Sequence, residues 1–144
     1  MVPETGPYLK AAAFCESVIE GKDGVLSLIR IIDRLTITAA GNELPTEMEP
    51  FRTVLRLAVM FISGRAKGTH DVTLRVERPD GTSARAWSGT IFLEGEERGA
   101  NVVIEMSTEF RMEGLYWFDV LFDEIQMTRV PFRVIYQRAG LATA

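Results

Sequence analysis

The sequence predicts an all-β fold, a single-domain antiparallel β-sandwich of about eight strands with an immunoglobulin-like pattern. Turn-forming segments such as GKDG at 21–24 and PDG at 79–81 recur at short, fairly regular intervals. The segments between the turns are rich in Val, Ile, Thr, Phe and Tyr, and several alternate apolar with polar residues. Such spacing is typical of sandwiches and barrels rather than of alternating strands and helices. Strands are expected near residues 9–20, 25–38, 52–62, 70–78, 82–93, 101–111, 115–122 and 126–137.

Size and composition limit the class of protein. The chain has 144 residues, of which 47% are hydrophobic and 25% charged, and a net charge of −4. These are ordinary values for one globular domain, which we expect at 9–138 between tails at 1–8 and 139–144. The acidic balance argues against nucleic acid and anionic membranes as partners. No apolar run reaches the ~20 residues that span a bilayer, and one cysteine with no signal-peptide pattern suits the cytoplasm.

The first three expected strands differ in how clearly their sequence predicts a strand. In 9–20, alternation places six residues on the core side: Leu9, Ala11, Ala13, Cys15, Ser17 and Ile19. The segments 25–38 and 52–62 also fit a helical apolar stripe, so periodicity alone does not decide between strand and helix. Their β-branched residues, the hairpin chemistry of EGKDG and the lack of a helix N-cap favour strands. Asp33 breaks the alternation, which indicates either a bulge that turns it outward or a buried carboxylate paired with an arginine.

The later strands alternate strictly. In HDVTLRVER the apolar residues Val72, Leu74 and Val76 share one face, and NVVIEMSTEF repeats this pattern. The PDG turn joins 70–78 to 82–93 as a three-residue hairpin loop. Each of these strands is therefore expected to bury one face.

The last two strands predict their own register. A three-residue turn at 123–125 would pair Phe118 with Val130 and place both on the core side. The same register sets Asp119 opposite Arg129 on the outer face, as an exposed cross-strand ion pair. A slip by one residue would turn every aromatic side chain outward, so this register is strongly specified.

These segments resemble an uncharacterised family of small bacterial proteins, a domain of unknown function. The resemblance rests on AAAFCESV, KDGVLSLIRIIDRLTI, GTHDVTLRVERPDG and GLYWFDVLFDEIQMTRVPFRVIYQ, and covers most of residues 9–137. Its motifs are turns and core positions, so it implies an immunoglobulin-like fold and no catalytic residues. The turn FDEI departs from the family's Asp-Gly, which suggests a longer or bulged loop there.

No catalytic constellation is visible in the sequence. A Cys-His nucleophile would need Cys15 and His70, but Cys15 sits among alanines on an apolar face and is expected to be a buried structural thiol. A serine hydrolase would need His70, and no G-x-S-x-G elbow presents a serine. We expect a non-catalytic protein without cofactor or metal. A hydrolase assembled from residues far apart in the sequence is a less favoured alternative.

The outward aromatic residues give the main functional prediction. Trp87 and Trp117 fall on predicted outer faces, with Leu121, Arg129 and Arg133 on the outer face of the closing pair. Large apolar groups on an outer face are typical of a partner surface. We therefore expect a protein-interaction or structural module of an intracellular assembly, binding itself or another protein through this sheet face or an edge strand.

The alternative function is a small-ligand or metal-binding sandwich. Its site would lie in the loops at 63–70 and 94–101. The first loop carries glycines and basic residues in SGRAKGTH, and the second carries the acidic cluster Glu94, Glu96 and Glu97. Neither loop matches a phosphate-binding or calcium-binding motif, so solvated loops remain the competing interpretation.

Overall fold

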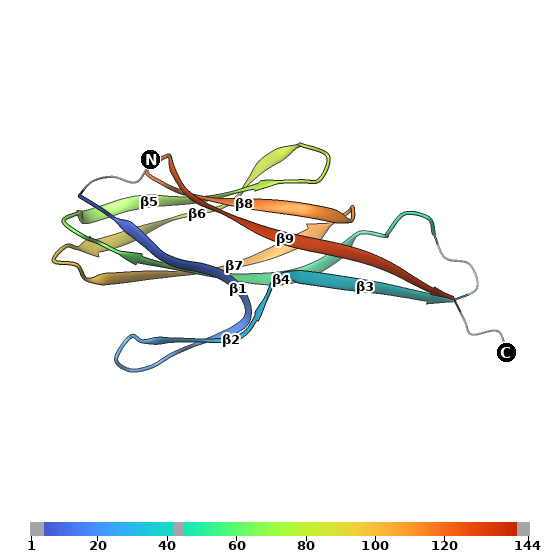
Figure 1. Cartoon of the computed structure of the whole chain (residues 1–144), viewed down its shortest axis with the longest axis horizontal. Coiled ribbons are helices and arrows are strands. Elements are labelled where there is room, and N and C mark those ends of the chain that lie inside the picture. The colour runs from blue at the N-terminus through green and yellow to red at the C-terminus, as the bar shows by residue number, and fades with distance from the viewer. Residues whose placement is uncertain (1–4, 42–44, 141–144) are drawn as a thin grey trace.

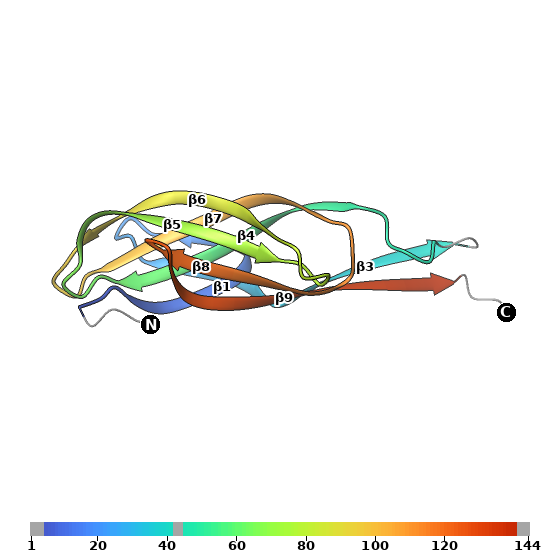
Figure 2. The same cartoon turned by 90° about the horizontal axis from the view of Figure 1, so that it is seen from above.

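The computed structural model describes residues 5–41 and 45–140. Within these residues, nine strands form two sheets that pack face to face (Figures 1 and 2). Sheet A has the order β2-β1-β4-β7, and sheet B has the order β3-β9-β8-β5-β6. The strands are β1 (Tyr8–Glu20), β2 (Leu26–Ile32), β3 (Arg34–Gly41), β4 (Phe51–Ile62), β5 (Lys67–Glu77), β6 (Ser83–Glu94), β7 (Gly99–Phe110), β8 (Gly114–Phe122) and β9 (Ile125–Gly140). The prediction of an all-β, sandwich-like fold is confirmed. None of the described residues forms a helix long and apolar enough to cross a membrane.

The segment 25–38 is two strands rather than one, which corrects the predicted number. β2 pairs with β1 in sheet A, whereas β3 pairs in parallel with β9 in sheet B. The chain changes sheet at Asp33, whose carbonyl accepts a hydrogen bond from the Arg133 amide at 3.0 Å. The Asp33 carboxylate stays in solvent, paired with Arg34 at 2.9 Å. Asp33 is therefore the exposed junction between two strands, and both 25–38 and 52–62 are strands rather than helices.

Phenylalanine rings hold the two sheets together. Phe14 of β1 meets Phe118 of β8 and Phe132 of β9, with ring centroids 5.0 Å apart in both pairs and interplanar angles of 71° and 61°. Phe110 of β7 stacks on Phe132 at 6.0 Å. All four rings are buried. Such ring pairs add about 0.5–1.5 kcal/mol each beyond the burial of their area.

Leu9 packs on the core as predicted, but from Ala11 onward the inward face of β1 is the opposite of the predicted one. The pairing of β1 with β4 shifts by one residue between Leu9 and Ala11, so Lys10 is the extra residue of a bulge. After the bulge, Ala12 and Phe14 pack on the core cluster. The residues expected inside, from Ala11 to Ile19 at alternate positions, therefore lie on the outer side of sheet A.

The closing hairpin keeps its predicted register by a different route. Phe118 pairs with Val130, and Asp119 lies opposite Arg129, as expected. The turn, however, contains only Asp123 and Glu124, at φ 45° and 69°, which is the left-handed geometry of a two-residue hairpin turn. A one-residue register shift close to the turn then restores the pairing. The expected three-residue turn is wrong, and the pairing derived from it is confirmed.

Both ends of the sandwich are more ordered than tails would be. Gly6 and Pro7 are buried, and the Arg65 amide donates to the Thr5 carbonyl at 2.8 Å. β9 continues past the expected domain end at 138 and runs beside β3 as an arm that extends beyond the other strands (Figures 1 and 2). The rest of the predicted tails, residues 1–4 and 141–144, lies outside the described residues.

Replacing Phe14 tests the orientation of β1. Phe14→Ala is expected to lower the free energy of unfolding by about 3–5 kcal/mol, because it removes a fully buried ring between the sheets. Ile19→Ala, on the face predicted from alternation, should change it by at most about 0.5 kcal/mol, because Ile19 is exposed. Urea denaturation measures both. A larger loss for Ile19→Ala than for Phe14→Ala would contradict the observed orientation.

Candidate functional site

Trp117 lies on the outer face of sheet B, where it was expected. Its neighbours Tyr116 and Phe118 point into the core, and Trp117 itself is half-buried. The Arg129 guanidinium lies over its ring, 4.8 Å from the centroid. This cation–π contact covers part of the indole, so Trp117 offers less apolar surface than its position in the sequence suggests.

Arg129 is also part of a charged network on this outer face. The carboxylate of Asp119 accepts hydrogen bonds from Arg129 at 2.7 Å and from Arg75 at 3.1 Å. Glu77 accepts a further bond from Arg129 at 2.7 Å. The Asp119 side chain is only 5% exposed, so the expected surface ion pair is a largely buried carboxylate held by two arginines. A surface with this many fixed charges is costly to desolvate.

Two of the predicted interface residues are not exposed. Leu121 is buried. Trp87 packs against the core cluster, which corrects its expected outward orientation. The pairing of β6 with β5 contains an extra residue, Ala86, so Trp87 lies opposite the core residue Leu74. Arg133 is exposed on β9, as expected, and its part in an interface stays a prediction.

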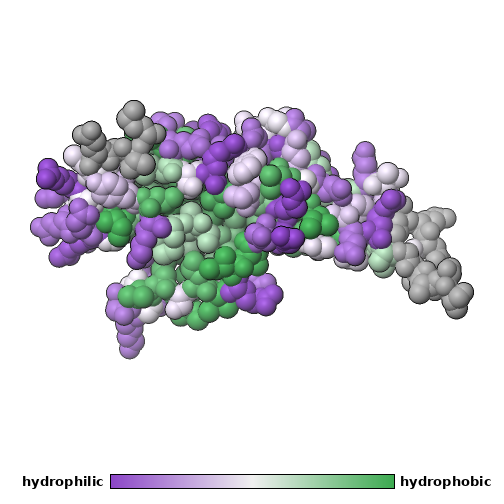
Figure 3. Space-filling view, viewed as in Figure 1, coloured by the Kyte–Doolittle hydropathy of each residue, from purple (hydrophilic) through white to green (hydrophobic). Residues whose placement is uncertain are grey.

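The outer side of sheet A is a second surface, and we name it outer face A. It is formed by the side chains of β1, β2, β4 and β7 that point away from sheet B. Its exposed apolar residues are Ile19, Ile29, Ile31, Val54 and Val103. Small side chains lie beside these residues on the same face, for example Ala13 and Ala58, which are in one cross-strand row with Val103. Figure 3 shows apolar residues gathered over the middle of β1 and over the β1–β2 hairpin, which projects from the body.

The charges of outer face A are paired with one another. Arg56 lies 3.1 Å from Glu105, and Arg52 lies 3.4 Å from Glu109. Arg56 also donates to the Glu16 carbonyl at 2.9 Å. The face is therefore apolar and close to electrically neutral.

Outer face A was missed because its residues were assigned to the core. The signal that could have revealed it is the segment VLRLAVMFI at 54–62, which is apolar at both parities. A strand with one solvated face alternates apolar with polar residues, whereas a strand that is apolar on both sides is covered on both.

The loops at 63–70 and 94–101 lie side by side at one end of the sandwich. The buried Ser63 hydroxyl is 2.8 Å from the Arg98 carbonyl, and the Glu97 amide donates to the Gly64 carbonyl at 3.1 Å. Arg98 pairs with Glu94 at 2.8 Å, so the acidic cluster is partly neutralised from within. Among the described residues, no group of three or more His, Cys, Asp or Glu side chains could hold a metal ion. A ligand site in these loops stays a prediction.

Cys15 and His70 lie apart, each with its own structural role. Cys15 is buried on outer face A, opposite Arg56. Burial raises the pKa of its thiol, and the nearby Arg56 charge opposes this only in part. His70 instead joins β5 to the β8–β9 turn, because its Nδ1 is 2.6 Å from the Asp123 carboxylate and its Nε2 is 2.8 Å from the Lys67 carbonyl. Both partners are acceptors, so the protonated imidazole satisfies both contacts.

The sequence and the fold were compared with known proteins. A family model described as a family of unknown function, DUF6941, matches residues 10–135. The chain belongs to this family. The expected resemblance to an uncharacterised family is thereby confirmed, whereas the bacterial origin of that family stays a prediction. No curated protein matches the sequence.

Solved structures match this DUF6941 chain only at low identity and low TM-score. β-Glucosidase 3B from Thermotoga neapolitana matches over 89% of the chain, at 13% identity and a TM-score of 0.49, and β-glucosidase from Listeria innocua over 94%, at 9% identity and a TM-score of 0.47. The DNA glycosylase AlkC of Pseudomonas fluorescens matches over 69%, at 10% identity and a TM-score of 0.39. The chain spans 16%, 17% and 27% of these proteins. Similarities of this size carry no functional information for the chain.

The His70–Asp123 contact makes stability depend on pH. The hydrogen bond that the His70 imidazole donates to the Asp123 carboxylate raises the His70 pKa above 6.5, although partial burial opposes it. A raised pKa in the folded state adds stability that is fully present below pH 6.5 and is lost as the pH rises through the folded pKa. Because His70 is the only histidine, the free energy of unfolding should fall as the pH rises from about 6.5 through the raised pKa of folded His70, as urea denaturation will measure.

Two variants isolate this effect. Asp123→Asn keeps a residue that tolerates the left-handed turn and should bring the His70 pKa, measured by NMR titration, back toward 6.5. His70→Gln should flatten the pH dependence over the same window. An unchanged His70 pKa in Asp123→Asn would show that the 2.6 Å contact does not control it.

Proposed function

We propose that this protein is a non-catalytic module that self-associates through outer face A. The observation that carries the proposal is the group of exposed Ile and Val side chains on β1, β2, β4 and β7. Contiguous exposed apolar side chains on a soluble domain are typical of an interface. The Ile31 side chain, on the edge strand β2, is 65% exposed.

The charge pattern favours a second copy of the same chain as the partner. In a two-fold dimer each patch meets its own copy, so a patch with a net charge would repel itself. On outer face A, Arg56 is paired with Glu105 and Arg52 with Glu109. The face can therefore meet itself without like-charge repulsion. Sheet B offers Arg75, Arg129 and a largely buried Asp119 instead, which would have to be desolvated.

The proposal includes a single immunoglobulin-like domain. The order β9-β8-β5 in sheet B corresponds to the G-F-C strands of immunoglobulin sandwiches. The hydroxyl of Tyr116, near the start of β8, donates to the Met112 carbonyl at 2.6 Å. This bond resembles the tyrosine corner of such domains, in which a tyrosine near the start of strand F bonds to the backbone upstream.

We also propose a cytoplasmic location, which the single unpaired cysteine supports.

The solution mass across a dilution series tests the self-association. The wild-type protein should form a dimer at high concentration and dissociate on dilution, as sedimentation velocity will show. In the double variant Ile31→Ser, Val103→Ser the dissociation constant should rise tenfold or more, because burial of one such side chain contributes about 1.5–3 kcal/mol. Both residues are exposed in the monomer, so the variant should stay folded by circular dichroism.

Matched variants on sheet B serve as controls. Phe92 is 64% exposed on β6, close to the 65% of Ile31, so Phe92→Ser removes an equally exposed apolar group and should leave the mass unchanged. Trp117→Ala tests the outer face of sheet B. If Trp117→Ala alone weakens the dimer, or if the wild type is a monomer at every concentration, outer face A is not a self-interface.

A further inference from the structure

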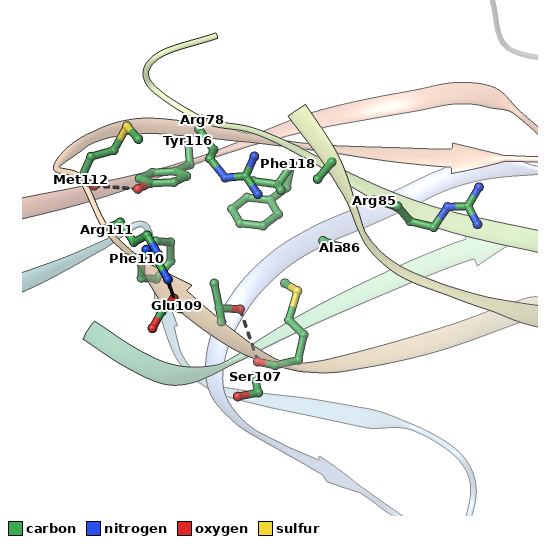
Figure 4. A pocket seen from close by; sticks show the side chains of 14 residues that line it. Arg78, Arg85, Ala86, Ser107, Glu109, Phe110, Arg111, Met112, Tyr116 and Phe118 are labelled. Carbon is green, nitrogen blue, oxygen red and sulfur yellow. Dashed lines mark hydrogen bonds and ion pairs between the residues drawn. The ribbon is translucent and has the colours of Figure 1, made fainter. Parts of the chain in front are cut away.

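A cleft opens between the two sheets, along one side of the sandwich. It lies between the first half of β6 and the second half of β7, at the ends of these strands that are far from the turn joining them. Its volume is about 470 Å³, within the usual range of ligand sites, about 300–1,000 Å³. The rings of Phe110, Tyr116 and Phe118 lie along its inner side (Figure 4).

Small residues on β6 leave this space unfilled. Ala84 and Ala86 line the cleft, whereas further along β6 the core side carries the buried residues Ile91 and Leu93. Ala86 is the extra residue of the β6 bulge, and bulges often lie beside binding sites. The bond from the Tyr116 hydroxyl to the Met112 carbonyl at 2.6 Å fixes the Tyr116 ring in the wall. The cleft is thus held open by backbone geometry and by a fixed aromatic ring.

Two of the arginines that line the cleft, Arg78 and Arg85, form no ion pair with a described residue, and Figure 4 shows Arg85 pointing away from the aromatic rings. Figure 4 shows the Arg78 side chain reaching over the rings of Tyr116 and Phe118. Its guanidinium makes a 3.3 Å hydrogen bond to the Thr82 hydroxyl, and it forms no ion pair with any described residue. Arg111, across the mouth, is paired with Glu109 at 2.9 Å. Arg78 therefore brings a positive charge without an ion-pair partner to a cleft with an aromatic wall. The nearby Asp80, whose pKa is lowered by hydrogen bonds from Thr82 and also by the Arg78 charge, is not in direct contact with it.

We propose that this cleft binds a small amphipathic anion, with its apolar body against Phe110, Tyr116 and Phe118 and its anionic group on Arg78. A guanidinium binds a carboxylate or a phosphate through a bidentate pair of hydrogen bonds. This contact is stronger where water is partly excluded. The ring faces and the alanines accept an alkyl or aromatic body of modest size. This site is separate from the loops at 63–70 and 94–101 and does not require self-association.

Chain-matched probes test both parts of the site. Octanoate, 1-octanol and octylammonium differ in charge and share one alkyl chain. On titration of the ¹⁵N-labelled protein, octanoate should saturate one site and shift the amide signals of Ala86 and Met112. It should bind at least tenfold more tightly than 1-octanol, the range expected for one charge-assisted hydrogen bond, and octylammonium should bind more weakly still. Octyl phosphate, compared with octanoate, distinguishes a phosphate ligand from a carboxylate ligand.

Variants then locate the binding. Arg78→Gln should weaken octanoate binding tenfold or more and leave 1-octanol binding unchanged, whereas Arg138→Gln, an exposed arginine on the arm of β9, removes the same charge and should change neither. Ala86→Phe should abolish binding of both probes by filling the cleft, with Ala84→Leu as a second filling variant if Ala86→Phe does not fold.

Two results would overturn the proposal. One is octanoate binding that persists in a folded filling variant. The other is a set of amide shifts confined to outer face A, at residues such as Ile31 and Val103. The Ile31→Ser, Val103→Ser variant separates the two surfaces, because it should keep octanoate binding in the cleft whether or not the chain forms a dimer.

Discussion

The contact of Phe14 with Phe118 and Phe132 determines much of what the rest of sheet A presents. The Phe14 ring lies 5.0 Å from each of these two rings across the sandwich. Because side chains alternate along a strand, fixing Phe14 inward fixes Ala13 and Cys15 outward. The same register sets Ala58 and Val103 beside Ala13 on the outer side. An apolar outer face is therefore a geometric consequence of the aromatic contact in the core.

The sequence predicted the strands well wherever alternation is unbroken, as in β5, β7 and β8. It failed where one residue is inserted or the chain changes sheet. A period-two pattern does not record the extra residue at Lys10, so β1 was turned inside out, and the extra residue Ala86 misplaced Trp87 in the same way. At Asp33 a single polar residue separates two strands of different sheets. Bulges and changes of sheet depend on pairing with strands that are far away in the sequence. The apolar pattern within one segment therefore does not reveal them.

The outer faces of sheets A and B differ in the free energy of removing water from them. On sheet B, Asp119 is held by Arg75 and Arg129, and Arg129 also covers Trp117. The arginines are partly exposed, so their charges keep favourable contact with solvent that a partner would have to replace. On outer face A the ion pairs are internal to the face, and exposed Ile and Val side chains gain from losing water. Electrostatics and hydrophobicity thus agree on which face is the better interface.

β7 links the two proposed sites. Its outward residue Val103 belongs to outer face A, and its inward residues Met106 and Phe110 line the cleft. β7 is also an edge strand, paired only with β4 in sheet A. Its second half is therefore held by hydrogen bonds to β4, and a ligand in the cleft would contact its inward face. Two ligands that contact opposite faces of one strand are coupled only if each favours a different position of that strand. Since β4 pairs with β7 along its whole length, from Phe51 to Ile62, the ladder holds β7 in one register. The geometry therefore favours two sites that are occupied independently.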